Sequence, residues 1–348
     1  MRPVPRLCSL AAMTLFGSTT PAWAQSSVQI YGLLDVSAGQ FQNAGGLKVK
    51  RLDSGNYSTS HIGFRGTEDL GGGLRAGFTL ESFLLLDSGG AGRVPNVDAF
   101  WGRNAVVNLS GGFGNVRLGR MGPPMWISTL QFNPFGDSFG FSPAVRQYYS
   151  LPAGTPVVGD SGWNNAIAYT TPAMGGLSAT VMVAAGEGAV NSRGKNLGAS
   201  ATYRAGPLGV TAAWQEVKTQ GTLGRPIFAF PGFGSQNAYQ FGGSYDFGVM
   251  RLFAQYGRIR TDATLDVDTT NVHVGASVPI GKGALLAAYG TSDVDVAGPT
   301  PERTSKIMTV GYDYPLSKRT NVYAVYLSDK FTGLTNGTTY AAGMRHRF

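Results

Sequence analysis

The chain has 348 residues and a formal net charge of +8, with 51 glycines and only 14% charged residues. Glycine is about twice as frequent as in average globular proteins, and charged residues are about half as frequent. The lone cysteine, Cys8, excludes a scaffold stapled by disulfides. The basic excess is compatible with nucleic-acid binding, but basic residues are spread along the chain without a lysine-rich run, which argues against that class.

The first 24 residues are predicted to be a secretory signal peptide. Two arginines precede an apolar run from Leu7 to Gly17, and the stretch ends in Ala-Trp-Ala at residues 22–24, which is the order of a signal with its cleavage site. The run is too short to span a bilayer as a helix, and an uncleaved anchor is the alternative. Cleavage would leave 348 − 24 = 324 residues, beginning at Gln25.

The rest of the chain is predicted to form β-strands. Apolar residues mostly alternate with polar or small ones in segments such as 239–247 and 271–280. This period of two is typical of strands with one apolar face. After the signal, no uninterrupted apolar run reaches the length of a transmembrane helix. We expect strands at 28–40, 56–67, 73–86, 97–109, 113–121, 163–171, 177–186, 196–205, 209–219, 236–247, 249–260, 269–280, 283–292, 304–316, 319–328 and 338–348.

Short and long connections are expected to alternate between these strands. The short turns lie near residues 69–73, 110–114, 172–176, 205–209, 247–249, 279–283 and 315–319, and the long loops near 41–55, 87–96, 121–161, 187–195, 220–235, 261–268, 293–303 and 328–337. This arrangement, with an even number of strands, is the signature of a transmembrane β-barrel. The barrel must close because an open edge in lipid leaves backbone groups unpaired. Sixteen strands enclose an aqueous lumen, and a soluble all-β fold is the alternative.

Several ordered motifs resemble one protein family. They are VQIYGLLDVSAG, GFRGTEDLGGGLRAGFTLES, GFGNVRLGR, NPFGD, AIAYTTP, YDYPLSKRTNVY and the terminal Phe348. Together they resemble the 16-stranded general porins of Gram-negative bacteria, and the resemblance runs from Val28 to Phe348. It implies an all-β fold, a 16-stranded antiparallel transmembrane β-barrel at residues 25–348, with a third loop at about 121–161 folded inward to narrow it.

The same resemblance implies a homotrimer in the outer membrane, in contact with its lipid. The expected function is a water-filled channel for passive diffusion of small hydrophilic solutes and inorganic ions, without a cofactor or a nucleic-acid partner. The alternative is a substrate-specific channel with saturable binding, because the third loop is rich in aromatic residues that could supply a binding site.

Catalysis is a third class that the residues of segment 60–81 suggest at first sight. A phosphate-binding loop needs its glycines to lead into a helix, followed by lysine and a hydroxyl residue. Here the glycines lead into a predicted strand. His61 and His273 lie in different strands without a serine or carboxylate at diagnostic spacing, so neither a triad nor a metal cluster is predicted. We expect no enzyme.

Strand parity predicts which side chains face the lumen. The strand 97–109 is less regular, because an inward Arg103 turns Asn104 and Asn108 toward lipid. We expect this register because the family motif places Arg103 inward. The candidate pore-lining or constriction residues are Tyr31, Asp35, His61, Arg65, Arg75, Glu81, Arg103, Arg117 and, in the third loop, Asp137.

The chain departs from the wall arginines that the resemblance implies. The first of three positions is His61, the second is Arg103, and the third is Gly162. The third loop has only two carboxylates, Asp137 and Asp160. Because remote charges are screened over about 8 Å at physiological ionic strength, the local excess of arginines predicts a weak preference for anions.

Overall fold

The structure is a computed structural model that describes residues 27–93, 98–150, 157–186, 194–218, 230–299 and 301–348. The predicted signal peptide lies outside the described residues. The strands are β1 (Ser27–Phe41), β2 (Val49–Ser54), β3 (His61–Gly71), β4 (Leu74–Phe83), β5 (Asn104–Gly111), β6 (Gly114–Met121), β7 (Trp163–Thr170), β8 (Leu177–Ala184), β9 (Asn196–Ala205), β10 (Leu208–Val217), β11 (Ser235–Asp246), β12 (Arg251–Asp262), β13 (Val267–Ile280), β14 (Gly283–Val296), β15 (Arg303–Pro315), β16 (Thr320–Phe331) and β17 (Gly337–Arg347). Two helices, α1 (Pro124–Gln131) and α2 (Pro143–Tyr149), lie between β6 and β7.

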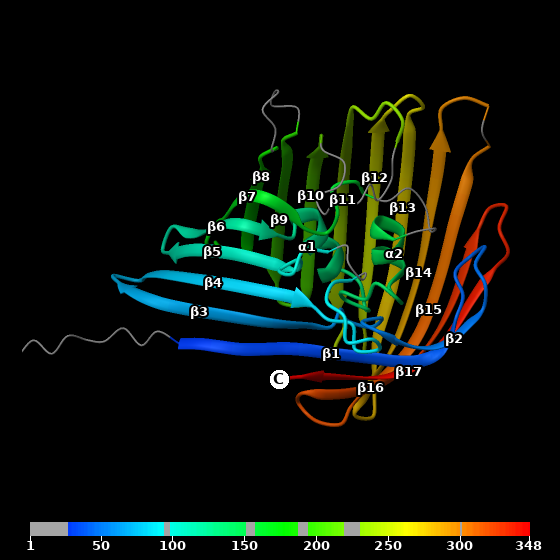
Figure 1. Cartoon of the computed structure of the whole chain (residues 1–348), viewed down its shortest axis with the longest axis horizontal. Coiled ribbons are helices and arrows are strands. Elements are labelled where there is room, and N and C mark those ends of the chain that lie inside the picture. The colour runs from blue at the N-terminus through cyan, green and yellow to red at the C-terminus, as the bar shows by residue number, and fades with distance from the viewer. Residues whose placement is uncertain (1–26, 94–97, 151–156, 187–193, 219–229, 300) are drawn as a thin grey trace, which may run out of the picture.

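The strands close into an antiparallel barrel. From β3 to β17 each strand pairs with the next, and β1 pairs with both β3 and β17, so that sixteen strands form a ring. The short β2 is an addition that pairs with the far end of β1. In Figure 1 the near strands β3 to β6 run across the far strands β11 to β14 at a steep angle, as expected when the strands of a barrel tilt against its axis.

The two faces of the wall carry opposite chemistry. Val274 is 52% exposed while its neighbour His273 is only 4% exposed. The same holds on β11, where Phe241 is 54% exposed and Gln240 is fully buried. Apolar residues therefore cover the outer face, as the predicted parity required and as a barrel in lipid needs. The inner face is mostly polar, with apolar residues such as Ile259 where L3 packs on it.

The predicted strands agree with the structure except at some of their ends, and β3, β14 and β16 continue past the expected ends to Gly71, Val296 and Phe331. The strand expected at 56–67 begins only at His61, and the one expected at 97–109 begins only at Asn104. The loop expected at 41–55 contains β2, which extends the wall beyond β3. The loop expected at 261–268 is shorter, because β12 and β13 continue to Asp262 and from Val267.

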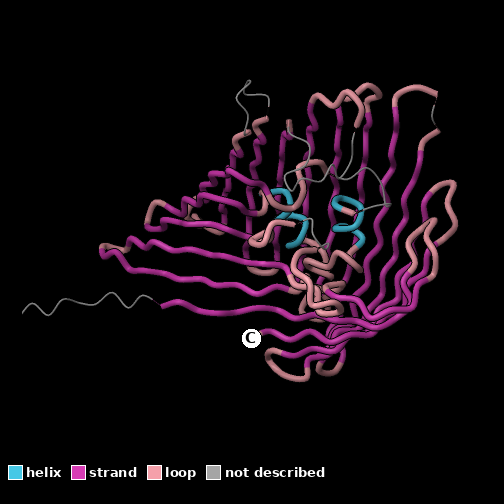
Figure 2. Tube along the Cα trace, in the orientation of Figure 1, coloured by secondary structure: helices cyan, strands magenta, loops and turns pink. Residues whose placement is uncertain are grey.

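Three connections between strands matter for function. We call them loop L1 (residues 42–60), loop L2 (84–103) and loop L3 (122–162). L3 holds both helices, and these contact the wall: α1 contacts β8 to β11, and α2 contacts β13 to β15. Figure 2 shows the two helices in cyan among the strands. We call the end of the barrel with L1 to L3 the long-loop end and the opposite end the short-turn end.

Candidate functional site

Helices α1 and α2 dock on the polar face of the wall. Gln255 Nε2, on β12, donates to Thr129 O at 3.1 Å and to Phe132 O at 2.8 Å. Gln147 Nε2, on α2, donates to Gly290 O at 3.2 Å and to Ser305 O at 3.1 Å. L3 is thus bound to the inner face of β12, β14 and β15, which leaves the wall of β1, β3 to β6 and β17 opposite it.

Glycines on neighbouring strands make room for L3 to pack against the wall. A Cβ atom on Gly257 would collide with the hydroxyl of Tyr148, and one on Gly290 would collide with Gln147. On the strand between them, a Cβ atom on Gly275 would lie 2.6 Å from Pro134 Cδ. The absence of side chains on β12, β13 and β14 therefore lets L3 approach the backbone of the wall.

On the opposite wall, Glu81 contacts two other predicted site residues, Tyr31 and Arg103. Tyr31 Oη donates to Glu81 Oε1 at 2.7 Å, and Arg103 Nε lies 3.2 Å from Glu81 Oε2. The Glu81 side chain is 9% exposed, whereas that of Arg103 is 26% exposed. The carboxylate is thus enclosed by its partners, and the arginine presents part of its guanidinium to the lumen.

His61 lies beside this group. Its Nδ1 is 2.9 Å from Thr59 O, and the ring centroid is 6.4 Å from that of Tyr31. Arg103 Nη1 donates to Thr59 Oγ1 at 3.2 Å. The imidazole and the guanidinium therefore share Thr59, and the structure brings His61, Tyr31, Glu81 and Arg103 together as one group.

The expected parity of the strand containing Arg103 is wrong. Asn104 is directly opposite Glu81 in the register and its amide donates to that carboxylate. Asn104 and Asn108 therefore face the lumen, and Val107 between them is 57% exposed on the outer face. Arg103 precedes β5, so its side chain reaches Glu81 without following the alternation of the strand.

Asp35 is fully buried and holds L1 against the wall. Its carboxylate accepts hydrogen bonds from Tyr57 N at 2.7 Å, Ser58 N at 3.0 Å and Tyr323 Oη at 2.7 Å. Three donors on two different parts of the chain leave little of the carboxylate for solutes. Asp35 thus serves to place L1.

Ser58 links the third loop to the last strand. Its hydroxyl donates to Asp137 Oδ1 at 2.9 Å and accepts from Arg345 Nη1 at 3.1 Å. Arg345 also lies 3.1 Å from Asp313 Oδ2. Asp137 of L3 and Arg345 of β17 therefore stand on the two sides of one serine. Arg345 has the inward parity of its strand, and its contact with Ser58 adds it to this group.

Loop L2 is tied to the end of L3 by buried ion pairs. Arg93 Nη2 lies 3.0 Å from Asp98 Oδ1 and 2.8 Å from Asp160 Oδ2. Burial alone would raise the pKa of Asp160, but the hydrogen bonds and charge of Arg93 outweigh it and hold that pKa below its usual range.

The position of the third implied arginine, Gly162, is occupied by a neighbour. A Cβ atom on Gly162 would lie 2.8 Å from Arg120 Nη2. Arg120 donates to Gly102 O at 2.7 Å, Gly162 O at 3.1 Å and Asn164 Oδ1 at 2.7 Å. The guanidinium of Arg120 thus fills the space that a larger residue at 162 would need, which the sequence pattern did not reveal.

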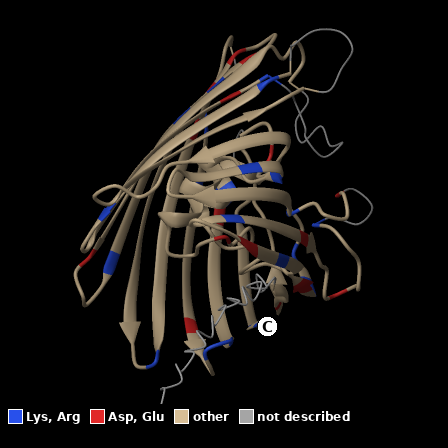
Figure 3. Ribbon diagram, turned by 90° about the vertical axis from the view of Figure 1, so that its left-hand side faces the viewer, with Lys and Arg blue, Asp and Glu red and all other residues tan. Residues whose placement is uncertain are grey.

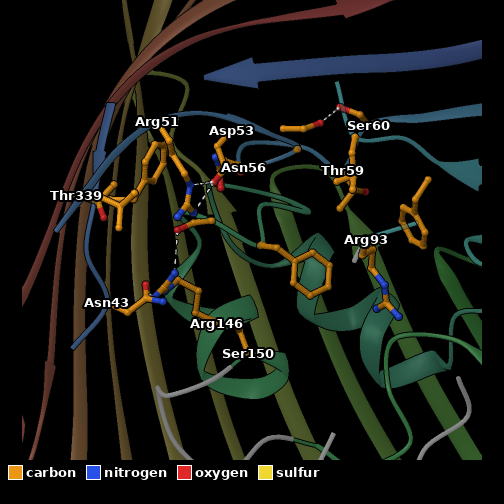
Figure 4. A pocket seen from close by; sticks show the side chains of 18 of the residues that line it. Asn43, Arg51, Asp53, Asn56, Thr59, Ser60, Arg93, Arg146, Ser150 and Thr339 are labelled. Carbon is orange, nitrogen blue, oxygen red and sulfur yellow. Dashed lines mark hydrogen bonds and ion pairs between the residues drawn. The ribbon is translucent and has the colours of Figure 1, made fainter. Parts of the chain in front are cut away.

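A pocket of about 480 Å³ opens at the long-loop end. Arg51, Arg93 and Arg146, from L1, L2 and L3, line it (Figure 4). Each is ion-paired: Arg51 with Asp53 at 2.7 Å, Arg146 with Asp329 at 2.8 Å, and Arg93 as described above. The charges around this vestibule are therefore largely balanced.

Arginines nearer the short-turn end lack such partners. Arg65 donates to the amide oxygen Gln29 Oε1 at 2.7 Å and stacks over Tyr31. Arg75 and Arg117 face the lumen on β4 and β6. No carboxylate within the described residues lies within 4 Å of these three cations. Figure 3 shows charges of both signs around the central loop segments and long uncharged stretches on the strands.

In the described parts of the chain, no helix has the length and apolar character needed to cross a membrane. Among the same residues, no group of three histidine, cysteine, aspartate or glutamate side chains is arranged to hold a metal ion.

Comparison with known proteins identifies the family. A model described as "Gram-negative porin" matches residues 9–334. Outer membrane porin protein 32 of Delftia acidovorans is 32% identical, covering 97% of this chain and 95% of that protein. An outer membrane porin protein of Bordetella pertussis is 28% identical, covering 97% of this chain and 99% of that protein.

Solved structures agree with this fold. The anion-selective porin from Comamonas acidovorans superposes with a TM-score of 0.76 at 29% identity, over 93% of this chain and 100% of that one. OmpT of Vibrio cholerae, in a trimer form, gives a TM-score of 0.66 at 14% identity over 93% and 99%. The chain belongs to the Gram-negative porin family and is an outer-membrane porin, a β-barrel channel for passive diffusion.

Proposed function

We propose that this porin passes small hydrophilic solutes with a weak preference for anions. The observation that carries the proposal is the imbalance of charge along the lumen. Around L3 the cations Arg93, Arg103, Arg146 and Arg345 are each paired with a carboxylate, whereas Arg65, Arg75 and Arg117 have no such partner within the described residues. The similar porin from Comamonas acidovorans is described as anion-selective, which supports the same direction.

The sign of the selectivity follows from local electrostatics. At physiological ionic strength charges are screened beyond about 8 Å, so a permeating ion interacts mainly with the side chains of the wall beside it. Paired arginines present little net field, while unpaired ones raise the local anion concentration. The preference is weak because Asp137 and Glu81 lie in the same passage.

We propose further that L3, which corresponds to the third loop expected at about 121–161, sets the size limit of the channel. Its two helices fill part of the cross-section because they contact the inner face of β8 to β15. We also propose that residues 1–24 are a cleaved signal peptide and that the protein is a homotrimer, which the trimer form of the similar OmpT fold supports.

We infer no catalytic activity. Within the described residues, His61 Nδ1 meets a backbone carbonyl and His273 Nε2 meets Gln147 Oε1 at 2.8 Å. Neither contact supplies the serine or carboxylate partner that nucleophilic catalysis by a histidine-dependent enzyme needs.

Two measurements test the proposal. In planar bilayers under a KCl gradient, the reversal potential should have the sign of anion preference at neutral pH, and cation preference would overturn it. In proteoliposomes, swelling rates with sugars of graded size should fall smoothly with solute size. Saturation at millimolar concentrations of a sugar would instead favour a substrate-specific channel.

A further inference from the structure

Two arginines that are distant in sequence approach one serine at the short-turn end of the lumen. Arg251, at the start of β12, donates from Nη2 to Ser244 Oγ at 3.1 Å. Arg204, at the end of β9, lies on the other side of the same serine. A Cβ atom on Gly209 would be 3.4 Å from Arg204 Nη1 and 3.1 Å from Ser244 Oγ. The strand register places Gly209 directly opposite both Arg204 and Ser244.

These two guanidinium groups are held by neutral partners. Arg204 Nη2 donates to Gln131 Oε1 at 3.1 Å, and its Cζ lies 5.3 Å from the centroid of Phe132. Arg251 Cζ lies 5.3 Å from the centroid of Phe253, and its Nε is buried without a hydrogen-bond partner. Aromatic stacking and one amide therefore fix both cations in place without neutralising them.

The carboxylate opposite Arg251 in the register does not neutralise it. This residue is Asp246, and its Oδ1 accepts a hydrogen bond from Gly248 N at 2.8 Å in the turn. Within the described residues, neither Arg204 nor Arg251 has a carboxylate oxygen within 4 Å. Two like charges that share a serine repel each other, and an anion between them would remove that repulsion.

A pocket rich in hydroxyl groups adjoins Arg204. It has a volume of about 410 Å³ and lies between α1 and strands β7 to β9. Arg204 and Gln131 line it, and no carboxylate does. Its hydroxyl-bearing residues are Ser128, Thr170, Ser178, Thr180, Ser200 and Thr202. Thr170 already bonds Thr180 at 3.0 Å, and Ser128 and Thr202 each bond Thr211 at 3.1 Å. Each hydroxyl can donate one hydrogen bond, so Ser178 and Ser200 are the neutral donors that the pocket offers beside the fixed cation.

We propose that Arg204, Arg251 and this hydroxyl pocket form a binding site for a multivalent oxyanion of the phosphate or phosphate-monoester class. Arginine forks match the oxygen atoms of phosphate in bidentate fashion, and two of them suit a dianion better than chloride or a single carboxylate. The hydroxyl groups would receive the remaining oxygens, or the polar part of an ester. The proposal rests on the proposed passage of anions through this channel.

The position of the site determines from which side of the membrane an anion reaches it. Short turns of outer-membrane barrels face the periplasm, and Arg204 and Arg251 each lie next to such a turn. A phosphate dianion would therefore reach the site from the periplasmic side without passing L3. Once bound, it would slow chloride current by occupying the lumen and by neutralising the two cations.

Inorganic phosphate is the probe that tests the site. Channels inserted in one orientation in planar bilayers are held in KCl at pH 8, and phosphate is added to either side at constant ionic strength. In wild type, chloride current should fall saturably as phosphate is added. The concentration for half block should be lower when phosphate is added on the short-turn side than on the long-loop side. In Arg204→Gln/Arg251→Gln the concentration for half block should rise about tenfold or more, since each lost charge-assisted hydrogen bond is worth that factor.

Three controls make the outcome decisive. Lys282→Gln removes a positive charge from the exposed turn between β13 and β14 at the same end, and should leave the block unchanged. Arg204→Lys/Arg251→Lys keeps the charge without the fork and should retain part of it. A heat-dependent shift in electrophoretic mobility shows that each variant has folded as a barrel.

The proposal fails if the double glutamine variant is blocked like wild type, or if wild type shows no phosphate block. The KCl reversal potential of the same membranes separates this failure from that of the proposed function. Anion preference without phosphate block would overturn the site alone. Cation preference would overturn the proposed anion passage itself.

Discussion

Arg93 Nη2 of loop L2 lies 2.8 Å from Asp160 Oδ2 at the end of loop L3. Asp160 has a φ of 67°, a left-handed conformation that is uncommon outside glycine. Its side chain is 6% exposed. The ion pair therefore fixes the point at which L3 leaves the lumen and enters β7. Because L3 occupies part of the cross-section, this contact on L2 contributes to the shape of the passage.

We predict that Arg93→Gln loosens L3. Breaking one partner of a buried ion pair costs about 3–5 kcal/mol, because the Asp160 carboxylate stays buried without its countercharge. Single-channel recordings should show more frequent transient closures, and the temperature of barrel unfolding should fall.

Arg51→Gln is the matched comparison for that variant. It removes an arginine from the same vestibule, but the Arg51 side chain is 47% exposed and its pair with Asp53 lies in solvent, where such pairs are worth about 0–1 kcal/mol. Equal effects of the two substitutions would contradict a special role for the contact between L2 and L3.

The depressed pKa of Asp160 predicts how the contact responds to acid. A carboxylate with a lowered pKa contributes its stability fully above the pKa of the unfolded chain, about 3.9, and loses it only as pH falls through the lower folded value. Wild-type closure frequency should therefore be constant between pH 8 and 5. In Arg93→Gln, burial acts without the main countercharge and raises the pKa of Asp160, so acidification should stabilise this variant. A wild-type channel that destabilises already at pH 5 would contradict the assignment.

Asp35→Asn should release L1. The carboxylate accepts three hydrogen bonds, and bonds to a charged group contribute about 1.5–3 kcal/mol each. An asparagine presents one acceptor oxygen and an amide NH2 group, which is itself a donor, to the same donors. We expect a lower unfolding temperature and faster proteolysis in L1. Asp53→Asn, at the exposed pair with Arg51, should have little effect, and equal proteolysis of the two variants would contradict the anchor.

Strand parity predicts the wall because lipid outside and water inside impose opposite chemistry on alternate residues. Val274 and His273 are placed correctly by that rule alone. It fails at Arg103, which precedes β5 and so has no parity. There the direction taken from the family motif, extended along the strand, put Asn104 on the wrong face.

Strand parity cannot predict contacts between loops. The pairing of Arg93 with Asp160 joins residues 67 positions apart, and Arg345 meets Ser58 across 287 positions. Neither has a periodic signal, because closure of the barrel brings β17 to L1 and the course of L3 back to β7 brings Asp160 to L2. The packing of L3 on the wall could not be predicted from the sequence either. Nothing in the sequence distinguishes Gly257 and Gly290 from other small residues, and only the structure shows Tyr148 and Gln147 packed against them.

The contact between Gly257 and Tyr148 yields another prediction. Gly257→Ala would place a methyl group against the Tyr148 hydroxyl and push α2 away from β12. Overpacking of this kind costs typically about 1–3 kcal/mol, and the channel conductance should change because L3 shifts in the lumen. Gly243→Ala on β11 is the control, since its Cβ would meet only Gly209 O at 4.0 Å. Unchanged conductance and stability in Gly257→Ala would show that L3 does not rest on this glycine.

The group around Glu81 predicts how selectivity can be shifted in both directions. Glu81→Gln keeps the shape of the side chain but removes the negative charge that pairs with Arg103 at 3.2 Å. The charge of Arg103, whose side chain is 26% exposed, then acts without compensation, and anion preference should increase. Arg103→Gln should decrease it, because Glu81 becomes the uncompensated charge.

The KCl reversal potential measures both shifts, and the double variant Glu81→Gln/Arg103→Gln should return close to wild type. The two substitutions remove one charge of each sign, so their opposite effects should cancel in the double variant. His61→Arg adds a permanent cation beside the same pair and should shift the potential in the direction of Glu81→Gln. If Glu81→Gln and Arg103→Gln moved the reversal potential in the same direction, the pair would not control the charge that a permeating ion meets.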